Sequence, residues 1–222
     1  MNGGDVRFRD RRHAGRVLAG LLDAYRGSPQ LVVLALPRGG VPVAFEVAQA
    51  LEAPLDVCVV RKLGLPGHEE YAMGAIASGG IQVLNPAAAG RVSRALIDQV
   101  VAREQLELQR RERLYRGAQP PLQLQGRTVI VVDDGLATGS TMRAAVLAIR
   151  QQQPARIVAG VPVGARDTCK ELRRHADDVV CAEMPEPFRA VGLAYADFQQ
   201  AGDDEVRTLL EAARLQPAAA HH

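Results

Sequence analysis

The sequence predicts an α/β protein with an open, mainly parallel sheet that is covered by helices on both faces. Short apolar runs rich in β-branched residues, such as residues 31–36 and 128–132, indicate strands that are buried on both faces. Segments with apolar residues at helical spacing alternate with these runs, which is typical of a parallel sheet built from βαβ units. Because ligands bind such sheets at the carboxyl ends of the strands, the segments to search are residues 37–40, 61–80, 133–141 and 163–167.

The length and composition favour a single globular domain and exclude several classes of protein. The chain has 222 residues, of which 47% are hydrophobic and 23% charged, as in globular proteins and unlike disordered chains. The 27 basic and 25 acidic residues nearly cancel, so the net charge gives no reason to expect a nucleic acid or an acidic membrane as partner. The longest apolar run, residues 31–36, is far shorter than the roughly 20 residues of a membrane helix.

The chain ends and the cysteines favour a cytoplasmic location. Charged residues between Asp5 and Arg12 stand where a secretory signal would need an apolar core. The three cysteines are scattered and odd in number, which suits a reducing compartment better than a disulfide framework. Residues 218–222 resemble the remnant of a histidine tag and are left out of the functional interpretation.

The first elements form a βαβ unit behind an N-terminal helix. Apolar residues recur at helical spacing after Asp10, so we expect this helix to run to about Gly27. The buried strand 31–36 follows, then a helix over 43–51 and a second buried strand over 55–60. A strand, a helix and a second strand in this order predict that the two strands are parallel.

The pattern breaks between residues 61 and 85. Glycines and prolines separate polar residues and two short alternating segments, 75–77 and 81–84. We therefore expect a long mobile loop with a small ribbon over about residues 61–85. Loops of this length in compact domains are usually functional.

The second half of the chain repeats the alternation of strands and helices. Ser93 can cap a long charged helix that reaches about Arg116 and presents a mostly solvated face. The later elements are a strand over 128–132, a helix with its core face at 142–149, a strand over 157–163, a short helix over 167–175, a strand over 179–182 and a last helix with its core face at 206–213. These elements predict one domain over residues 1–217, with a core at about 31–198 and a flap at about 184–198.

The most informative segment lies at the end of the strand 128–132. Apolar residues there precede two adjacent carboxylates, Asp133 and Asp134, and a turn of small residues, 135–141, opens the next helix. Unpaired amides at a helix start, with neighbouring hydroxyl groups, can bind a phosphate. Acidic residues beside a phosphate pocket need a partner that donates hydrogen bonds, such as vicinal sugar hydroxyls, or a metal ion. A phosphorylated ribose meets both requirements.

Other interpretations of the two acids stay open. They can be solvated side chains at a strand end, or a carboxylate cluster such as the phosphoacceptor site of a receiver domain. A receiver domain, however, has no reason to place a cradle of small residues directly after its acids.

Residues 129–142 resemble the signature of the type I phosphoribosyltransferases, in which four apolar residues and two acids precede a Thr/Gly/Ser loop. The segment is most similar to the adenine-type version, because Ala137 stands where hypoxanthine-type enzymes carry an aspartate that assists the base. The resemblance implies that Asp133 and Asp134 hold the ribose hydroxyls of phosphoribosyl pyrophosphate. It also implies that the 5-phosphate is bound by Ala137, Thr138, Gly139, Ser140 and Thr141.

A second candidate anion site follows the first buried strand. Arg38, Gly39 and Gly40 stand between Pro37 and the next helix, where an anion would meet a guanidinium group and backbone amides. On its own this sequence is an ordinary turn. Beside the 133–141 segment it resembles the pyrophosphate loop of the family, in which a cis peptide turns amides toward the leaving group.

Charged residues after the second strand are further candidates. Arg61 and Lys62 can neutralise pyrophosphate, the other interpretation being an exposed pair of charges. The segment 63–80 resembles the family's flexible hood, whose closure would exclude water from a reactive sugar cation. Glu70, which Tyr71 follows, matches the loop glutamate of adenine-type enzymes and is a candidate acid or base. Glutamates in mobile loops are also commonly only solvated.

The flap is expected to lie over the acceptor. Phe188 can stack on a flat base, because an aromatic face suits any ring. Alternatively, Phe188, Tyr195 and Phe198 form the small aromatic core of the flap itself. Residues 163–167 are expected to shape the floor of the site.

The resemblance covers about residues 31–198, is closest to the stand-alone bacterial predicted phosphoribosyltransferases, and implies an enzyme. This enzyme would transfer a 5-phosphoribosyl group from phosphoribosyl pyrophosphate to a nitrogenous base or similar small nucleophile, with inversion at the anomeric carbon and release of pyrophosphate. Mg²⁺ is the implied cofactor, to which Asp133 and Asp134 would contribute only indirectly, through ribose hydroxyls or water. A homodimer is compatible with the family, and neither a nucleic acid nor a membrane is expected as partner.

Two other functions stay open. The same fold can serve as a non-catalytic regulator that binds the donor or a nucleotide. Against this stand the long loop, with its candidate residues Arg61, Lys62 and Glu70, and the lack of a DNA-binding segment before residue 31. A third option is a nucleotide hydrolase or phosphotransferase on the same scaffold. The acceptor base is not identified, because the flap around Phe188 does not match a purine-type pattern.

Overall fold

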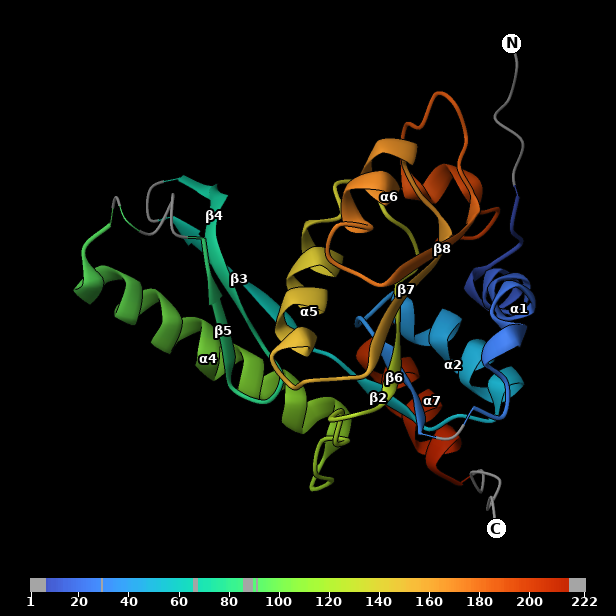
Figure 1. The fold of residues 1–222 in the computed structure, drawn as a ribbon, viewed down its shortest axis with the longest axis horizontal. Coiled ribbons are helices and arrows are strands. Elements are labelled where there is room, and N and C mark those ends of the chain that lie inside the picture. Colours follow the sequence, from blue (N-terminus) through green and yellow to red (C-terminus); the bar gives the residue numbers. More distant parts are fainter. Residues whose placement is uncertain (1–6, 29, 66–67, 86–89, 91, 216–222) are drawn as a thin grey trace.

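A parallel sheet forms the centre of the molecule (Figure 1). The structure is a computed structural model and describes residues 7–28, 30–65, 68–85, 90 and 92–215. Its five-stranded sheet has the order β2-β1-β6-β7-β8, and all of its neighbouring strands are parallel. The strands are β1 (Leu31–Ala35), β2 (Leu55–Val57), β6 (Thr128–Val132), β7 (Arg156–Val163) and β8 (Asp178–Glu183). The predicted open parallel sheet is confirmed.

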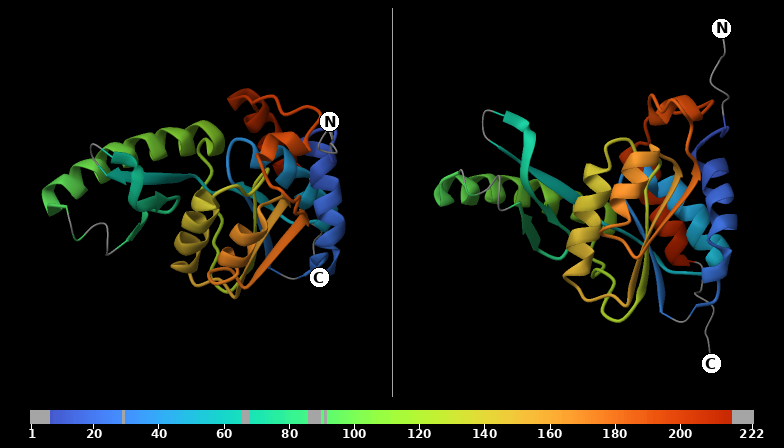
Figure 2. Two further views of the ribbon diagram at one scale, coloured as in Figure 1. Left: turned by 90° about the horizontal axis from the view of Figure 1, so that it is seen from above. Right: turned by 45° about the horizontal axis from the view of Figure 1, so that its top comes forward.

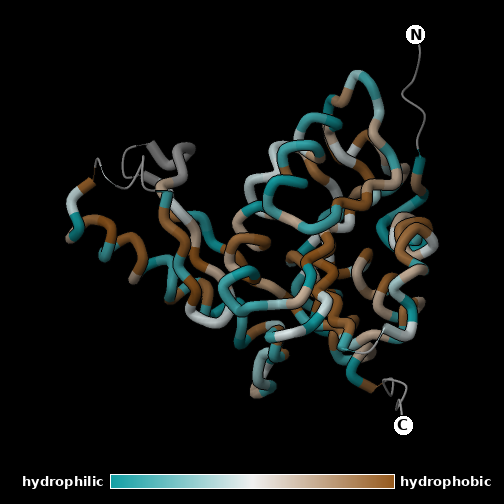
Figure 3. The backbone as a smooth tube through the Cα atoms, in the orientation of Figure 1, coloured by the Kyte–Doolittle hydropathy of each residue, from teal (hydrophilic) through white to brown (hydrophobic). Residues whose placement is uncertain are grey.

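Helices cover both faces of this sheet, as predicted (Figure 2). One face packs against α1 (Arg11–Leu21), α2 (Gly40–Leu51) and α7 (Asp203–Leu215), and the other against α5 (Ser140–Arg150) and α6 (Arg166–Leu172). Since side chains alternate along a strand, Val33 of β1 joins the core under α2, whereas Val32 and Leu34 join the core under α5. The central strands therefore form a hydrophobic band inside the molecule (Figure 3).

The order of the strands creates a topological switch point between β1 and β6. From β1 the chain proceeds through α2 to β2, and from β6 it proceeds through α5 in the opposite direction to β7. β1 and β6 are hydrogen-bonded neighbours, with Val33 opposite Ile130. The connections after these two strands thus diverge to opposite faces and leave a crevice, which is where open α/β sheets bind ligands. Residues 37–40 and 133–141 lie at that point.

A second sheet and a long helix form an arm that extends from the body (Figure 1). The sheet is antiparallel, with the order β3-β4-β5, and α4 packs along β3 and β4. The elements of the arm are β3 (Val60–Leu65), β4 (His68–Ala77), β5 (Ile81–Leu84) and α4 (Arg94–Arg116). Ser93 caps α4 by accepting a hydrogen bond from the Leu96 amide (3.4 Å), so the predicted helix and its cap are confirmed.

The prediction of a mostly irregular loop over residues 61–85 is wrong in extent, because the predicted ribbon is a three-stranded sheet. Gly74 lies within β4, where a Cβ atom would stand 2.4 Å from the carbonyl oxygen of Val83. Gly64 lies at an irregularity in the pairing of β3 with β4. Both glycines permit close approach or a bulge within strands instead of ending them.

Other boundaries differ slightly from the prediction. The N-terminal helix α1 ends at Leu21, and a short 3-10 helix, η1 (Asp23–Tyr25), follows it before Gly27. The flap contains another short 3-10 helix, η2 (Val191–Ala194). Across the ranges described above, no helix is both long and apolar enough to cross a membrane.

Candidate active site

The two predicted anion loops meet at the switch point between β1 and β6. The loop after β1 comes so close to the end of β6 that a Cβ atom at Gly39 would lie 2.0 Å from Oδ2 of Asp134. At Gly40 a Cβ atom would lie 2.7 Å from the carbonyl oxygen of Val132. Only glycine allows this approach. The structure therefore brings the Arg-Gly-Gly loop and the two acids into one site, as predicted.

The two acids are held close together in a poorly hydrated position. Oδ1 of Asp133 accepts a hydrogen bond from the amide of Asp134 (2.9 Å). Burial raises the pKa of Asp133 well above its ordinary value, and the charge of Asp134 raises it further. Burial also raises the pKa of Asp134, against the opposing effect of Arg11. Such a pair is stabilised by a ligand that donates hydrogen bonds or carries positive charge.

The partner of Asp134 comes from α1, at the other end of the sequence. Nε and Nη2 of Arg11 both lie 2.8 Å from Oδ2 of Asp134. Nη1 of Arg11 donates to the carbonyl oxygen of Gln199 (2.6 Å), and the guanidinium group stacks over the ring of Phe198, 4.0 Å from its centroid. Arg11 was not predicted as a site residue, because a charged N-terminal segment carries no local sign of a partner 123 residues away.

The turn after the acids is open to solvent and rigid at its base. Thr138 and Thr141 are exposed, and Gly139 adopts a left-handed conformation (φ 68°) directly before α5. In the described part of the chain, the amides of residues 138–141 have no acceptor. Below them, Thr168 donates to the carbonyl oxygen of Ala137 (2.7 Å). The loop thus presents free amides at a helix N-terminus, the arrangement that binds phosphate groups.

The loop after β1 has the conformation that the resemblance implies. The peptide bond between Pro37 and Arg38 is cis. Within the described residues, the amides of Arg38 and Gly39 have no acceptor. The guanidinium group of Arg38 is partly exposed and lies 3.9 Å from a carboxylate oxygen of Asp203, the first residue of α7. This loop can therefore offer amides and a partly exposed cation to a second anion.

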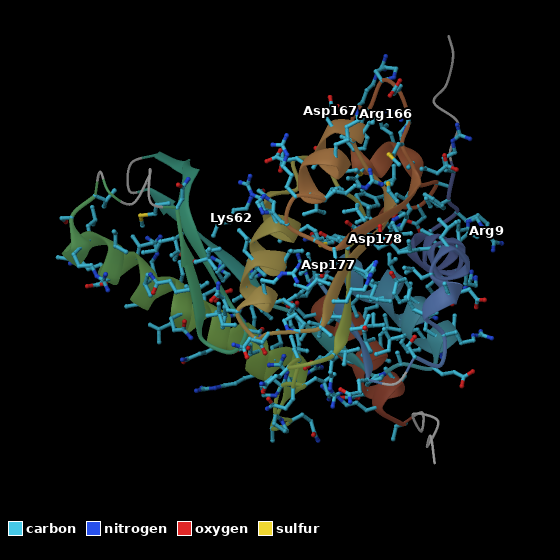
Figure 4. All side chains as sticks on the ribbon, in the orientation of Figure 1. Arg9, Lys62, Arg166, Asp167, Asp177 and Asp178 are labelled. Atoms are coloured by element: carbon cyan, nitrogen blue, oxygen red, sulfur yellow. The ribbon has the colours of Figure 1, made fainter. Side chains whose placement is uncertain are left out.

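Arg61 and Lys62 point in different directions. Nη2 and Nε of Arg61 lie 2.6 and 2.9 Å from a carboxylate oxygen of Glu104 in α4, so Arg61 is bound within the arm. Successive side chains of a strand alternate in direction, so Lys62 points away from Glu104. It borders a cavity of about 300 Å³ between the arm and α5, which Ser140 also lines (Figure 4). Both residues were expected at the pyrophosphate, but Arg61 is bound to Glu104, and Lys62 lines a cavity that includes Ser140 and no residue of the loop after β1.

Glu70 belongs to β4, but its side chain lies outside the described residues. Its role as an acid or base stays a prediction.

The flap has an aromatic core of its own. Phe188 and Phe198 pack, half-buried, against a small cluster that includes Phe8 and Tyr195. The Tyr195 hydroxyl donates to the carbonyl oxygen of Asp134 (2.5 Å), and its ring stacks on Phe198 with centroids 4.9 Å apart. This arrangement agrees with the aromatic-core alternative for the flap. Base stacking by Phe188 stays a prediction.

Comparison with known proteins gives a consistent family. Residues 10–197 match the family model of the phosphoribosyl transferase domain. Two Mycobacterium tuberculosis proteins named "Putative phosphoribosyl transferase", from strains CDC 1551 / Oshkosh and ATCC 25618 / H37Rv, are each 46% identical to this chain over 208 residues. The match covers 93% of this chain and 47% of each relative, so the chain spans about half the length of these curated relatives.

A solved structure shares the fold of this chain over most of its length. The crystal structure of TT1426 from Thermus thermophilus is 44% identical and superposes with a TM-score of 0.84, covering 92% of this chain and 97% of that one. The family model spans the switch point, both anion loops and the arm. The chain is therefore a member of the phosphoribosyl transferase family.

Proposed function

We propose that this protein transfers a 5-phosphoribosyl group from phosphoribosyl pyrophosphate to a nitrogenous base or similar small nucleophile and releases pyrophosphate. Membership of the family supports a transferase of this class. The observation that carries the finer proposal is the contact of the two anion loops, in which Gly39 lies against the carboxylate of Asp134. One molecule with two phosphate-bearing ends and a diol between them matches this arrangement.

Each part of the donor has a chemical counterpart at the site. The free amides of residues 138–141, at the N-terminus of α5, suit the 5-phosphate. Asp133 and Asp134 accept hydrogen bonds from the ribose hydroxyls, which relieves two crowded carboxylates. The amides of Arg38 and Gly39, with the Arg38 side chain, suit the pyrophosphate.

The residues present fit Mg²⁺ that is bound mainly through the substrate. Mg²⁺ prefers oxygen ligands and is commonly held by one or two carboxylates together with phosphate oxygens of the substrate. Asp133 and Asp134 would contribute indirectly, through ribose hydroxyls or water, and the burial that raises the pKa of both carboxyl groups favours a nearby positive charge. When bound, the ion would neutralise the charge of the leaving pyrophosphate.

The chain itself would act by placing charge and excluding water. Breaking the bond to pyrophosphate leaves positive charge on the ribose ring, as in other glycosyl transfers, and needs no covalent nucleophile on the protein. The two carboxylates at the end of β6 lie where the ribose would bind and favour that charge. Lys62, which lines a cavity between the arm and α5 together with Ser140, is the arm residue that we propose for neutralising the departing pyrophosphate.

Donor binding tests the proposal. We expect Asp134→Asn to fold normally and to bind phosphoribosyl pyrophosphate with Mg²⁺ about ten- to a hundredfold more weakly, because it loses a charge-assisted hydrogen bond worth about 1.5 to 3 kcal/mol. Titration calorimetry measures this affinity. Asp98→Asn is the matched control, since Asp98 is 58% exposed on α4, outside the proposed site, and pairs with Arg94 on the same helix. Unchanged affinity in Asp134→Asn would contradict the assignment.

Turnover separates an enzyme from a regulator. We expect pyrophosphate release when the donor, Mg²⁺ and a panel of nitrogenous bases are supplied together. Tight donor binding without release in the presence of every base would identify a non-catalytic binding protein on the same fold.

A further inference from the structure

Arg11 is built into the site from three sides. Two of its nitrogens contact a single oxygen, Oδ2 of Asp134, and the third donates to the backbone of Gln199. Phe198 covers one face of the guanidinium group. The side chains of Arg11 and Asp134 are only 12% and 17% exposed. An exposed surface arginine pairs loosely, whereas this one has every nitrogen engaged and little freedom to move.

The backbone around Arg11 is fixed by the flap. The segment before α1 pairs with the flap through hydrogen bonds from Ala196 to the carbonyl oxygen of Phe8 and from Asp197 to that of Arg9, both 2.8 Å. Tyr195 joins the flap to Asp134 through the carbonyl oxygen of that residue. The start of α1, the flap and the end of β6 thus form one unit around the carboxylate.

The other arginines of α1 behave differently. Arg12 and Arg16 both contact Glu46 of α2 at 3.1 and 3.0 Å, with side chains that are 49% and 51% exposed. Both arginines share the carboxylate of Glu46, which is 10% exposed, but their own side chains stay half exposed. Arg11 is thus set apart from its neighbours on the same helix by burial and by its partner.

We propose that Arg11 is a positioning residue, which holds Asp134 by Oδ2 so that its other oxygen, Oδ1, is ready to receive a hydroxyl of the ribose diol. This inference rests on the proposed function. No other side chain among the described residues donates a hydrogen bond to Oδ1 of Asp134, whereas Oδ2 receives both contacts from Arg11. The guanidinium group also offsets the charge of a carboxylate that lies beside Asp133. Without Arg11, the Asp134 side chain would be free to rotate or to take up a proton.

A double-mutant cycle tests this role in the full chain. The variants are Arg11→Gln, Asp134→Asn and their combination, with Arg12→Gln as the matched control on the same helix. Titration calorimetry with phosphoribosyl pyrophosphate and Mg²⁺ gives the donor affinity, and thermal unfolding of the same samples shows whether each variant folds. We expect Arg11→Gln to weaken donor binding about tenfold or more, and Arg12→Gln to change it less than about twofold.

The combination separates positioning from general packing. If Arg11 acts through Asp134, Arg11→Gln should change the affinity less than about twofold once Asp134 is already Asn. Arg11→Lys should be intermediate, because lysine keeps the charge but loses the planar fork of donors. In a turnover assay the loss should fall mainly on KM for the donor.

Several outcomes would overturn the inference. Wild-type affinity in Arg11→Gln would show that the contact has no role in binding, and tighter binding would show that Arg11 competes with the donor. If Arg11→Gln weakens donor binding equally in the wild-type and Asp134→Asn backgrounds, Arg11 would act through packing and not through Asp134. If the wild-type protein does not bind the donor, the proposed function falls and the positioning role falls with it. If only the Arg11 effect is absent, the proposed function stands.

Discussion

Two aspartate–arginine pairs lie on different strands of the parallel sheet and differ in how completely their carboxylates are hydrogen-bonded within the protein. Asp134 pairs with Arg11 at the carboxyl end of β6, and Asp56 of β2 pairs with Arg116, the last residue of α4. Both pairs join distant parts of the sequence, and both are largely removed from solvent. Only one of them lies at the switch point.

The Asp56 pair is complete. Nε of Arg116 lies 3.1 Å from each carboxylate oxygen of Asp56, and the amides of Val57 and Leu122 donate to that carboxylate at 2.8 and 3.3 Å. Arg116 also donates to the carbonyl oxygen of Val57 and to Glu112. Both carboxylate oxygens are thus engaged within the protein, so this pair anchors α4 to the sheet.

The Asp134 pair is incomplete by comparison. Arg11 uses one oxygen of Asp134, and a second carboxylate, Asp133, lies beside it with a raised pKa. A cavity of about 440 Å³ borders Asp56 and Arg116, whereas the proposed site is an open crevice between two loops. The proposed site therefore rests on a carboxylate that the protein pairs only in part, whereas cavity volume alone would direct attention to Asp56 and Arg116.

Breaking the complete pair should have the largest effect on stability. Arg116→Met leaves the 7% exposed carboxylate of Asp56 without its guanidinium partner, and we expect a loss of about 3 to 5 kcal/mol in the free energy of unfolding. Urea denaturation measures it. Arg113→Met, an exposed change on the same helix, should alter stability by less than about 0.5 kcal/mol. A loss below about 1 kcal/mol in Arg116→Met would show that the pair does not anchor α4.

Adding a side-chain atom beside the incomplete Asp134 pair should have the next largest effect, and this effect should fall on donor binding instead of stability. A Cβ atom at Gly39 would lie 2.0 Å from Oδ2 of Asp134, so Gly39→Ala must displace that carboxylate. We expect roughly tenfold weaker donor binding by calorimetry, equivalent to about 1.4 kcal/mol. Gly20→Ala in α1 meets nothing within 4 Å and should instead stabilise the helix by about 0.5 to 1 kcal/mol without changing the affinity. Equal affinities for both variants would refute the close contact.

Neutralising Asp133 should stabilise the ligand-free protein, and the gain in stability should be larger at neutral pH than in acid. Burial and the charge of Asp134 raise the pKa of Asp133 in the folded state, so the folded state binds a proton more tightly than the unfolded state does. The wild-type protein therefore loses stability as the pH rises from the ordinary aspartate pKa through the raised one. Arg11 and the Asp134 amide oppose this effect but do not cancel it.

At neutral pH we expect Asp133→Asn to have a free energy of unfolding higher than that of the wild type by on the order of 1 kcal/mol, and so to unfold at a higher temperature. This difference should disappear in acid. Thermal unfolding at several pH values measures the difference. Donor binding should be lost in the same variant. A variant that is less stable at every pH would mean that the Asp133 carboxylate is structural, like that of Asp56.

A third pair, in the arm, should give the smallest effects. Arg61→Gln removes two contacts to Glu104, whose side chain is 10% exposed, and we expect a loss of about 1 kcal/mol in denaturant unfolding with donor binding retained. Lys62→Gln, one residue away, should leave stability within about 0.5 kcal/mol and slow pyrophosphate release. Identical behaviour of the two variants would contradict their assignment to opposite sides of β3.

The elements with strong local signals were predicted well. Helix α4 and its Ser93 cap, strand β6 and the opening of α5 follow the expected residues closely, because apolar runs, caps and glycines act within a few residues. The arm was underestimated because Gly64 and Gly74 were interpreted as chain breaks. Their actual role depends on the neighbouring strand, which no local pattern describes.

In the candidate site, too, the features set by local sequence were predicted and those set by distant contacts were not. The meeting of the two candidate loops could be predicted because each is a compact motif at a strand end, and a parallel sheet brings such ends to one edge. The direction of Arg61 and Lys62 was not foreseen, since it depends on the register of β3 in the arm. The aromatic core of the flap was only one of two alternatives in the sequence.

The order of strands and helices, the two acids and the two glycine-containing loops follow from the sequence alone, because they arise from local preferences and from the general topology of parallel sheets. Only the tertiary structure decided which charges pair. Arg11 meets Asp134, and Arg116 meets Asp56, because α1 and α4 pack where their apolar faces are buried. Contacts across such separations depend on the packing of whole elements, and that packing leaves one carboxylate saturated and the other open to a ligand.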